Sequence, residues 1–271
     1  NMMKETVDTL GNQKKMNYAL REDMTRDEFI QEVTDGLLPP PSYFPLNVKM
    51  NKEGYDSFDE VITRGTKTLS PQEFETAANT TGAVMLDVRH QKEFIKGHVP
   101  NSIFIGLDGG FAPWVGDLIA DVKQPILLIV DEGREEEAVM RLSRVGFDNT
   151  LGYLKGGIEA WQQDGKEIAN MQSVSATVLK EKMKEEVAIF DVRKDAEYSS
   201  AHIPNAKHTS LSLINEYLSD YPTKEPFYVH CAGGYRSVIA ASILKNRGIH
   251  NVIDVAGGFK AIKEADIEIT A

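Results

Sequence analysis

Cysteine is almost absent from this sequence, since Cys231 is the single one among 271 residues. One thiol excludes an internal disulfide framework and fits a reducing compartment. Long apolar runs are absent as well, because no stretch approaches the roughly 20 residues of a membrane span and no signal-peptide pattern opens the chain. The cytoplasm is therefore the expected location.

Positive charge is also scarce. The 30 lysines and arginines face 41 acidic residues, and the formal net charge of −11 argues against nucleic acid and anionic membranes as partners. An anion-binding site must then be built locally, from backbone amides and a few arginines. The apolar share of 41% and the charged share of 26% are typical of a soluble globular protein, and the length fits two domains.

Histidines are few and scattered, with no spacing that suits a metal site. We therefore predict no bound metal and no cofactor. The six histidines are His90, His98, His202, His208, His230 and His250.

Cys231 opens a loop with the composition of an anion cradle. The loop Cys-Ala-Gly-Gly-Tyr-Arg-Ser (231–237) follows the strand-like run Phe227–His230 and precedes the helix-like run Val238–Leu244. Amides of a tight turn and a helix N-terminus converge at such a position, and they lower a thiol pKa from ~8.5 into roughly the 3.5–7.5 range. We expect a thiolate there, with Arg236 as a cation suited to oxyanions. The alternative is an inert buried cysteine.

The sequence contains the same unit twice. Asp87-Val88-Arg89 matches Asp191-Val192-Arg193, and Glu-Phe and His-Val-Pro-Asn in the first copy match Glu-Tyr and His-Ile-Pro-Asn in the second at the same spacing. Further along, each copy has a glycine pair, Gly156-Gly157 and Gly257-Gly258. We predict two tandem copies of one domain of roughly a hundred residues.

Within each copy, short β-rich runs alternate with helix-like stretches. This alternation indicates an α/β fold with a mainly parallel sheet and helices on both faces. In the first copy we expect strands over 84–88 and 126–130 and helices over 71–79 and 135–145. Ligands bind at the carboxyl ends of such strands, and Cys231 lies at one of them.

Residues 1–60 differ from the copies and are predicted to form an N-terminal arm with a proline-rich linker, followed by domains over 61–168 and 169–271. The proline-dense segment Leu37–Pro45 predicts an extended connector. The segment Thr25–Val33 before it predicts one short helix, capped by Thr25 and with Glu28 at the capping-box position.

The motifs of the second copy, taken in order, resemble those of the rhodanese (sulfurtransferase) family over residues 170–271. They are Asp-Val-Arg (191–193), His-Ile-Pro-Asn-Ala (202–206), the loop with His230 before it, and the glycine pair. The resemblance implies that Cys231 takes sulfane sulfur from thiosulfate or a low-molecular-weight persulfide, holds it as a cysteine persulfide, and passes it to a thiol or to cyanide. The loop residues implied to stabilise the persulfide are Ala232, Gly233, Gly234, Tyr235 and Arg236.

Arg193 has a second role implied by the resemblance. It matches an arginine that in some members of the family lies near the substrate anion. A salt bridge with Asp191 or Glu197 is an equal alternative. We interpret His202 and Asp191 as structural, because their counterparts recur in the first copy.

The first copy departs from the family at the catalytic loop. It reads Val-Asp-Glu-Gly-Arg-Glu-Glu-Glu over 130–137, with no cysteine. Three glutamates at a helix N-terminus fill an anion site with carboxylates. We therefore predict an inactive copy, in which Asp131 and Glu132 belong to the scaffold rather than act as bases.

The opening residues resemble the tail of the metallo-β-lactamase-fold domain in fusions of a persulfide dioxygenase with tandem rhodanese repeats. The resemblance covers Lys4–Gly11 and Asn17–Leu20. It implies a fused or associated persulfide dioxygenase as a partner. Because Asn1 is not a translation start, we expect a processed product, a cloning scar or a fragment of a longer enzyme. The iron chemistry of that domain is not carried over, since its histidine cluster is absent here.

Three alternatives compete with a sulfurtransferase. Cysteine phosphatases and arsenate reductases also pair a thiolate with an arginine, but phosphatases place five residues between them, whereas four separate Cys231 from Arg236. A non-enzymatic sulfur carrier or docking module fits the inactive first copy. A redox relay needs a resolving cysteine, which this chain lacks.

Overall fold

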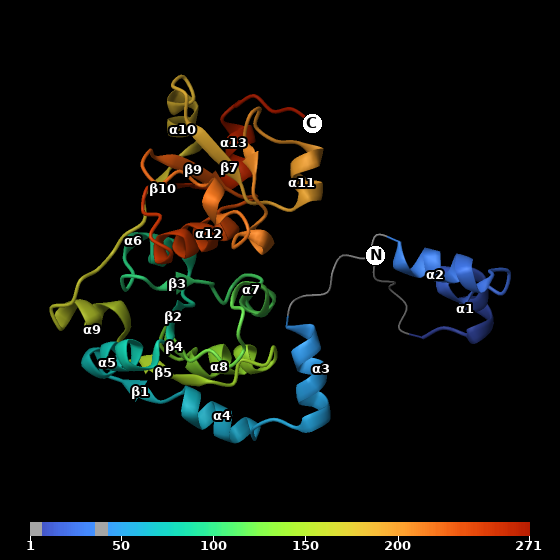
Figure 1. The fold of residues 1–271 in the computed structure, drawn as a ribbon, viewed down its shortest axis with the longest axis horizontal. Coiled ribbons are helices and arrows are strands. Elements are labelled where there is room, and N and C mark those ends of the chain that lie inside the picture. The colour runs from blue at the N-terminus through green and yellow to red at the C-terminus, as the bar shows by residue number, and fades with distance from the viewer. Residues whose placement is uncertain (1–6, 36–42) are drawn as a thin grey trace. The chain divides into compact units, whose positions relative to one another are not determined.

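The computed structural model describes residues 7–35 and 43–271, and the chain separates into two compact units, 1–40 and 41–271 (Figure 1). The first unit contains α1 (Leu10–Met16), the 3-10 helix η1 (Tyr18–Leu20) and α2 (Arg26–Thr34). A capping box between Thr25 and Glu28 starts α2, which confirms the predicted helix. None of the residues in these three helices is buried.

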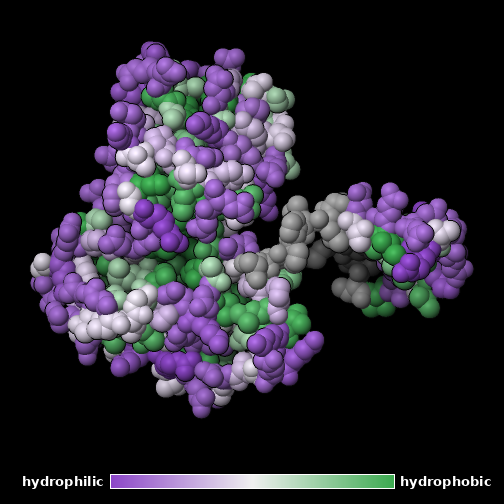
Figure 2. Space-filling view, viewed as in Figure 1, coloured by the Kyte–Doolittle hydropathy of each residue, from purple (hydrophilic) through white to green (hydrophobic). Residues whose placement is uncertain are grey.

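The second unit begins with α3 (Phe44–Glu53) and α4 (Phe58–Gly65). The predicted extended connector is wrong at its end, because Pro45 lies in the first turn of α3, where a proline breaks no intrahelical bond. The rest of that connector, residues 37–42, lies outside the described residues. Figure 2 shows hydrophobic surface over α3, where Phe44 and Val48 are exposed. In contrast, α4 buries Val61 and Gly65 against the first domain.

The first domain is built on a five-stranded parallel sheet with the order β1-β5-β4-β2-β3. Its strands are β1 (Thr68–Leu69), β2 (Val84–Asp87), β3 (Ile103–Phe104), β4 (Ile126–Ile129) and β5 (Thr150–Leu154). Its helices are α5 (Pro71–Thr81), α6 (Gln91–Lys96), α7 (Phe111–Leu118), α8 (Glu135–Ser143) and α9 (Gly157–Gln163). The strands and helices predicted for this copy are thus confirmed to within two residues at each end.

The second domain repeats this arrangement, with the sheet order β6-β10-β9-β7-β8 and parallel pairing throughout. Its strands are β6 (Ser173–Val174), β7 (Ala188–Asp191), β8 (Lys207–His208), β9 (Phe227–His230) and β10 (Val252–Val255). Its helices are α10 (Ala176–Lys182), α11 (Asp195–Ser200), η2 (Leu211–Leu213), η3 (Leu218–Asp220), α12 (Tyr235–Asn246) and α13 (Gly258–Glu264).

Alternate residues of the central strands face opposite sides of the second sheet, as strand geometry requires. Ile189 and Tyr228 pack in the apolar cluster that includes α10 and α13 residues. Phe190 and Val229 pack in the cluster that includes α12 residues. Helices therefore cover both faces, and the α/β fold with two tandem domains is confirmed.

Residues 237–244 of helix α12 are all buried, which is expected of a helix segment enclosed by protein. The helix packs on β9 and β10 of its own sheet and on β3 of the first domain. The Ser242 hydroxyl accepts a hydrogen bond of 3.0 Å from the Phe104 amide of β3. The buried apolar cluster is consequently continuous through both domains. The helix that starts at the cysteine loop is thus part of the contact between the domains (Figure 1).

Candidate active site

Cys231 directly follows β9, at the carboxyl end of the central strand of the second sheet. Gly234 has a φ of +96°, which favours glycine, and its amide donates a hydrogen bond of 3.2 Å to Cys231 Sγ. The thiol is 1% exposed in this resting arrangement. Gly258 approaches the loop so closely that a Cβ atom there would lie 2.3 Å from the Cys231 carbonyl oxygen. Both glycine motifs of the sequence therefore shape the same loop.

A chain of buried hydroxyl and carboxyl groups lies behind the thiol. Cys231 Sγ donates to Ser237 Oγ at 3.6 Å, and Ser237 Oγ donates to Asp254 Oδ1 at 2.6 Å. Ser173 Oγ donates to the other Asp254 oxygen at 2.7 Å. Burial raises the pKa of Asp254, against the effect of the two serine hydroxyls. Sequence reasoning missed Asp254, although an acidic residue inside the apolar run Val252–Val255 was a visible signal.

Arg236 lies beside the loop but is already paired. Its Nη1 and Nη2 atoms donate to the two oxygens of Glu197 at 2.6 and 2.8 Å, an end-to-end pair with bidentate geometry. This pair lowers the pKa of Glu197 to about 2, chiefly through the hydrogen bonds from Arg236. The hydrogen bonds with Glu197 raise the pKa of Arg236, and Cys231 contributes in the same direction. In this structure the predicted cation is therefore present near the thiol and largely neutralised by its partner.

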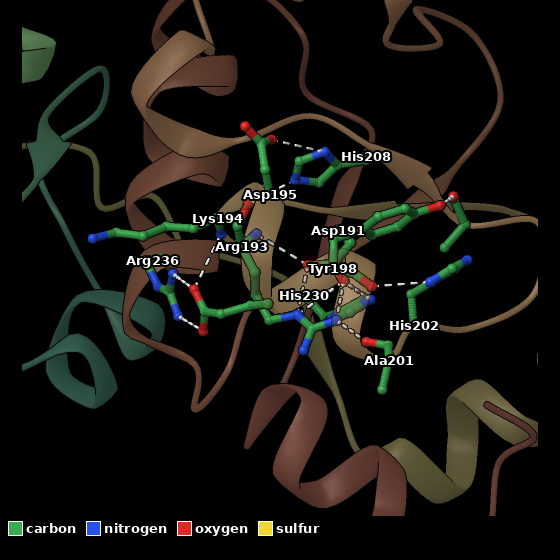
Figure 3. A network of polar contacts seen from close by, with 12 residues as sticks. Asp191, Arg193, Lys194, Asp195, Tyr198, Ala201, His202, His208, His230 and Arg236 are labelled. Carbon is green, nitrogen blue, oxygen red and sulfur yellow. Dashed lines mark hydrogen bonds and ion pairs between the residues drawn. The ribbon is translucent and has the colours of Figure 1, made fainter. Parts of the chain in front are cut away.

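Arg193 forms a salt bridge with Asp191, which was the alternative to anion binding. Its Nη2 atom donates to Asp191 Oδ2 at 2.6 Å and to the Ala201 carbonyl at 2.7 Å, and its guanidinium lies 3.7 Å from the Phe259 ring centre. Figure 3 shows Arg193 and Asp191 inside one network of polar contacts. Arg193 is 4% exposed, so the structure gives it a structural environment rather than an open anion site.

The first copy contains the same arrangement. Arg89 Nη2 donates to Asp87 Oδ2 at 2.6 Å and to the Gly97 carbonyl at 2.9 Å. Likewise, His202 Nδ1 contacts the Tyr198 carbonyl at 3.0 Å, and its counterpart His98 has the same kind of contact. Because the arrangement recurs without the cysteine, these contacts belong to the domain framework, as we interpreted for Asp191 and His202.

His230 precedes Cys231 and is completely buried. Among the described residues neither ring nitrogen has a hydrogen-bond partner, and Nε2 lies 3.8 Å from Asp191 Oδ2. Burial lowers the pKa of His230, with a smaller opposing effect of Asp191, so the ring is neutral at neutral pH.

Tyr235, at the end of the cysteine loop, reaches into the first domain. Its hydroxyl donates to the Gly106 carbonyl at 2.7 Å, and its ring meets the Phe104 ring edge-on at 5.7 Å between centres. A side chain at Gly109 would collide with this ring, at 2.2 Å from its Cζ atom. Burial raises the pKa of Tyr235, so the hydroxyl remains a donor. The first domain therefore helps to fix the position of the loop.

Replacing Tyr235 with phenylalanine is expected to loosen this loop. The change removes the donor to the buried Gly106 carbonyl at a cost of about 1–3 kcal/mol. If about 1 kcal/mol of this cost destabilises the closed loop relative to an open form, the population of the open form rises about fivefold. The measurement is the rate of Cys231 alkylation by iodoacetamide in the folded protein, which should rise by that factor. Tyr221→Phe is the matched control, because that hydroxyl bonds Thr209 within the second domain; an equal rise in both variants would contradict the assignment.

Two lysines border the loop on its outer side. A pocket of about 420 Å³ is lined by Ala232, Phe259, Lys260, Lys263 and Glu264. The amide of Lys260 also donates to the Ala232 carbonyl at 3.1 Å, which fixes α13 beside the loop. Sequence reasoning missed both lysines, because only the fold brings α13 to the cysteine loop.

The loop of the first copy is occupied by internal ion pairs. Arg134 pairs with Asp108 and with Glu137, both at 2.9 Å. Glutamates 135–137 form the first turn of α8, as predicted. The carboxylates thus lie where an anion would otherwise approach the helix N-terminus.

Within residues 7–35 and 43–271, no group of three or more histidine, cysteine or acidic side chains is arranged to hold a metal ion. Over the same residues, no helix has the length and apolar character needed to cross a membrane.

Comparison with known proteins gives two matches to the model described as "Rhodanese-like domain", at residues 70–164 and 175–265. The "Putative sulfur carrier protein YrkF" of Bacillus subtilis (strain 168) is 30% identical over 108 residues, which cover 39% of this chain and 56% of that protein. The chain thus spans little more than half the length of that relative.

A second relative is "Thiosulfate sulfurtransferase GlpE" of Coxiella burnetii (strain RSA 331 / Henzerling II). It is 34% identical over 80 residues, which cover 30% of this chain and 75% of that protein. A crystal structure of a rhodanese-like domain protein from Staphylococcus aureus is 35% identical, covers 37% of this chain and all of that chain, and has a TM-score of 0.35.

Proposed function

The chain belongs to the rhodanese-like family, and on this basis we propose that it is a sulfurtransferase that carries sulfane sulfur on Cys231. The observation that carries the proposal is the position of the Cys231 thiol after a central strand, in a loop whose Gly234 amide donates to it. We propose that residues 61–168 form an inactive copy and residues 169–271 the copy that transfers sulfur, in a cytoplasmic protein. The resemblance of the opening residues to a persulfide dioxygenase fusion stays a prediction.

The proposed reaction has two displacements. The Cys231 thiolate attacks the outer sulfur of thiosulfate or of a low-molecular-weight persulfide. A new S–S bond forms to Cys231, the donor's own S–S bond breaks, and sulfite or a thiolate leaves with the electron pair. An acceptor thiolate, or cyanide, then attacks the outer sulfur and Cys231 leaves as a thiolate. The loop residues 232–236 surround the persulfide, and their amides stabilise its charge.

The charges around the loop suggest how an anionic donor is attracted. Arg236 and Glu197 together are close to neutral, and Arg193 is neutralised by Asp191. We therefore assign donor attraction mainly to Lys260 and Lys263 at the rim, with Arg236 acting on the bound sulfur.

Replacing Lys260 and Lys263 together with alanine is expected to raise the KM for thiosulfate about threefold to tenfold with little change in kcat. The lysines act at long range on the free anion, and each exposed charge contributes on the order of 0.2–1 kcal/mol. The measurement is the steady-state rate of sulfur transfer to cyanide at low and high salt. High salt should reduce the difference in KM between the variant and the unmodified protein. Lys180→Ala with Lys184→Ala, on and just after α10, is the charge-matched control. An unchanged KM in the rim variant would remove the lysines from the proposal.

A sulfur carrier without turnover is the second candidate, and the burial of the thiol favours it. Cys231 is 1% exposed, so a donor must open the loop before it reacts. An associated or fused persulfide dioxygenase would be the partner that such a carrier serves. Sustained transfer between small molecules would exclude the carrier reading, whereas a single sulfur loaded without turnover would support it.

A further inference from the structure

The buried acid Asp254 is connected to Cys231 through one hydroxyl group, that of Ser237. We propose that Asp254, acting through Ser237, accepts the proton that Cys231 gives up when its thiolate forms. The inference rests on the proposed function, in which the thiolate is the nucleophile. It adds a proton acceptor that works inside the protein rather than through solvent.

The hydrogen-bond directions support a proton path. A carboxylate only accepts, so the Ser237 hydroxyl must give its single proton to Asp254, at 2.6 Å. Its oxygen then accepts from the Cys231 thiol, at 3.6 Å between Sγ and Oγ. The three side chains are each at most 1% exposed, so water does not compete for these bonds.

The buried acid has a reason to take a proton. Burial raises the pKa of Asp254, and among the described residues its interacting groups are the hydroxyls of Ser237 and Ser173, with no cation. A buried carboxylate without a cation is costly in its charged form. This contrasts with Asp191, which has the Arg193 guanidinium beside it. Asp254 is thus placed to exchange its charge with a neighbouring acid.

The step balances without any external reagent. The Cys231 S–H bond breaks and its proton goes to Ser237 Oγ, while the Ser237 proton goes to Asp254 Oδ1. The negative charge moves from Asp254 to Cys231, and the net charge of the pocket is unchanged. The resulting thiolate accepts hydrogen bonds from the Ser237 hydroxyl and from the Gly234 amide. When the persulfide later gives up its sulfur, the reverse shift returns the proton to Cys231.

The neighbouring groups Glu197 and His230 do not titrate near neutral pH. Arg236 faces Cys231 from α12, and its partner Glu197 on α11 has a pKa of about 2. His230 on β9 is neutral because burial lowers its pKa. On β7, Asp191 is held by Arg193. A titration observed at the thiol near neutral pH would therefore report Cys231 and Asp254 as a pair.

The copy without a cysteine also lacks this path. Counting back from the glycine pairs, the position of Asp254 is Tyr153 in the first copy. The neighbouring strand agrees, because Asp254 pairs in register with Ser173, and Tyr153 pairs with Thr68. The buried acid and the thiol therefore occur together in one copy and are absent together from the corresponding positions of the other.

The test is the pH dependence of the thiolate in the full chain, followed by its ultraviolet absorbance and by the rate of persulfide formation from thiosulfate. In the unmodified protein one proton is shared by the pair, so we expect both signals to stay within about twofold over a plateau of about two pH units around neutrality. In Asp254→Asn the thiol titrates alone. Both signals should then fall about tenfold for each pH unit below the midpoint.

Two further variants complete the design. Ser237→Ala removes the hydroxyl between the thiol and the acid while leaving Asp254 bonded to Ser173. Because equilibrium absorbance does not depend on a proton path, the readout for this variant is the rate of persulfide formation, which should fall at least about tenfold on the plateau even if Asp254→Asn fails to fold. Ser173→Ala removes a bond to Asp254 but keeps the path, and it should retain the plateau. A common profile of the persulfide-formation rate for the unmodified protein, Asp254→Asn and Ser237→Ala would overturn the relay. Because absorbance needs no donor, a plateau without persulfide formation would contradict the proposed function and leave the relay supported.

Discussion

Replacing Cys231 with serine is expected to abolish the gain of one sulfur atom that thiosulfate or glutathione persulfide gives the unmodified protein. The sulfur needs a thiolate to bond to, and a serine hydroxyl is a far weaker nucleophile at neutral pH. We expect transfer to cyanide to fall at least about a thousandfold, as is usual when a covalent nucleophile is removed. Intact-protein mass after exposure to each donor is the direct measurement.

The control for this variant is its stability. Serine differs from cysteine by one atom, and in the described residues the hydrogen bonds of the Cys231 side chain are those with the Gly234 amide and the Ser237 hydroxyl. The midpoint of unfolding by denaturant should therefore shift little. Sulfur uptake that persists in the serine variant would overturn the proposed function, since the chain has no second cysteine.

The same experiment separates the competing functions. A sulfur gained and then released repeatedly to a small acceptor identifies an enzyme, whereas a sulfur gained and retained identifies a carrier. No gain from either donor, together with hydrolysis of a phosphate ester, would favour the phosphatase reading. The spacing of Cys231 and Arg236 already counts against it, and the Glu197 carboxylate that occupies Arg236 adds a charge that repels phosphate.

The sequence was informative where function depends on local order. The loop from Cys231, the glycine pairs and the duplicated motifs are each read within a few residues, because a strand, a tight turn and a helix start have local signatures. The strand before the cysteine was predicted at Phe227–His230, which are its observed limits. The parallel sheet followed from the alternation of strands and helices.

The sequence was less informative where function depends on which side chain meets which. Arg236 could not be assigned to Glu197 from spacing, because the two residues are 39 positions apart and meet only when α11 and α12 pack. The role of Asp254, which lies in an otherwise apolar strand, could not be predicted, because it depends on a hydrogen bond from Ser237 across the pocket. The role of Tyr235 against Gly106 required the contact between the two domains. Local pattern predicts elements, whereas tertiary contacts decide the charge balance of the site.

Replacing Asp191 with asparagine is expected to destabilise the protein by about 3–5 kcal/mol, because it leaves the buried Arg193 cation without its carboxylate. The substitution preserves size and shape, so the loss reports the charge rather than a cavity. Arg193 cannot turn to water, since it is 4% exposed and its guanidinium is also held by the Ala201 carbonyl and the Phe259 ring. The measurement is the free energy of unfolding by denaturant.

Asp87→Asn is the matched variant in the first copy, where Arg89 has the same bonds. If the Asp-Val-Arg motif is framework, both variants should lose comparable stability, and the folded fraction of each should still take up sulfur at Cys231. A selective rise in the donor KM of Asp191→Asn, with stability unchanged, would instead restore Arg193 to the substrate site. The duplicated sequence thus supplies its own control: a motif shared by both copies is tested for stability, and the groups confined to the second copy are tested for chemistry.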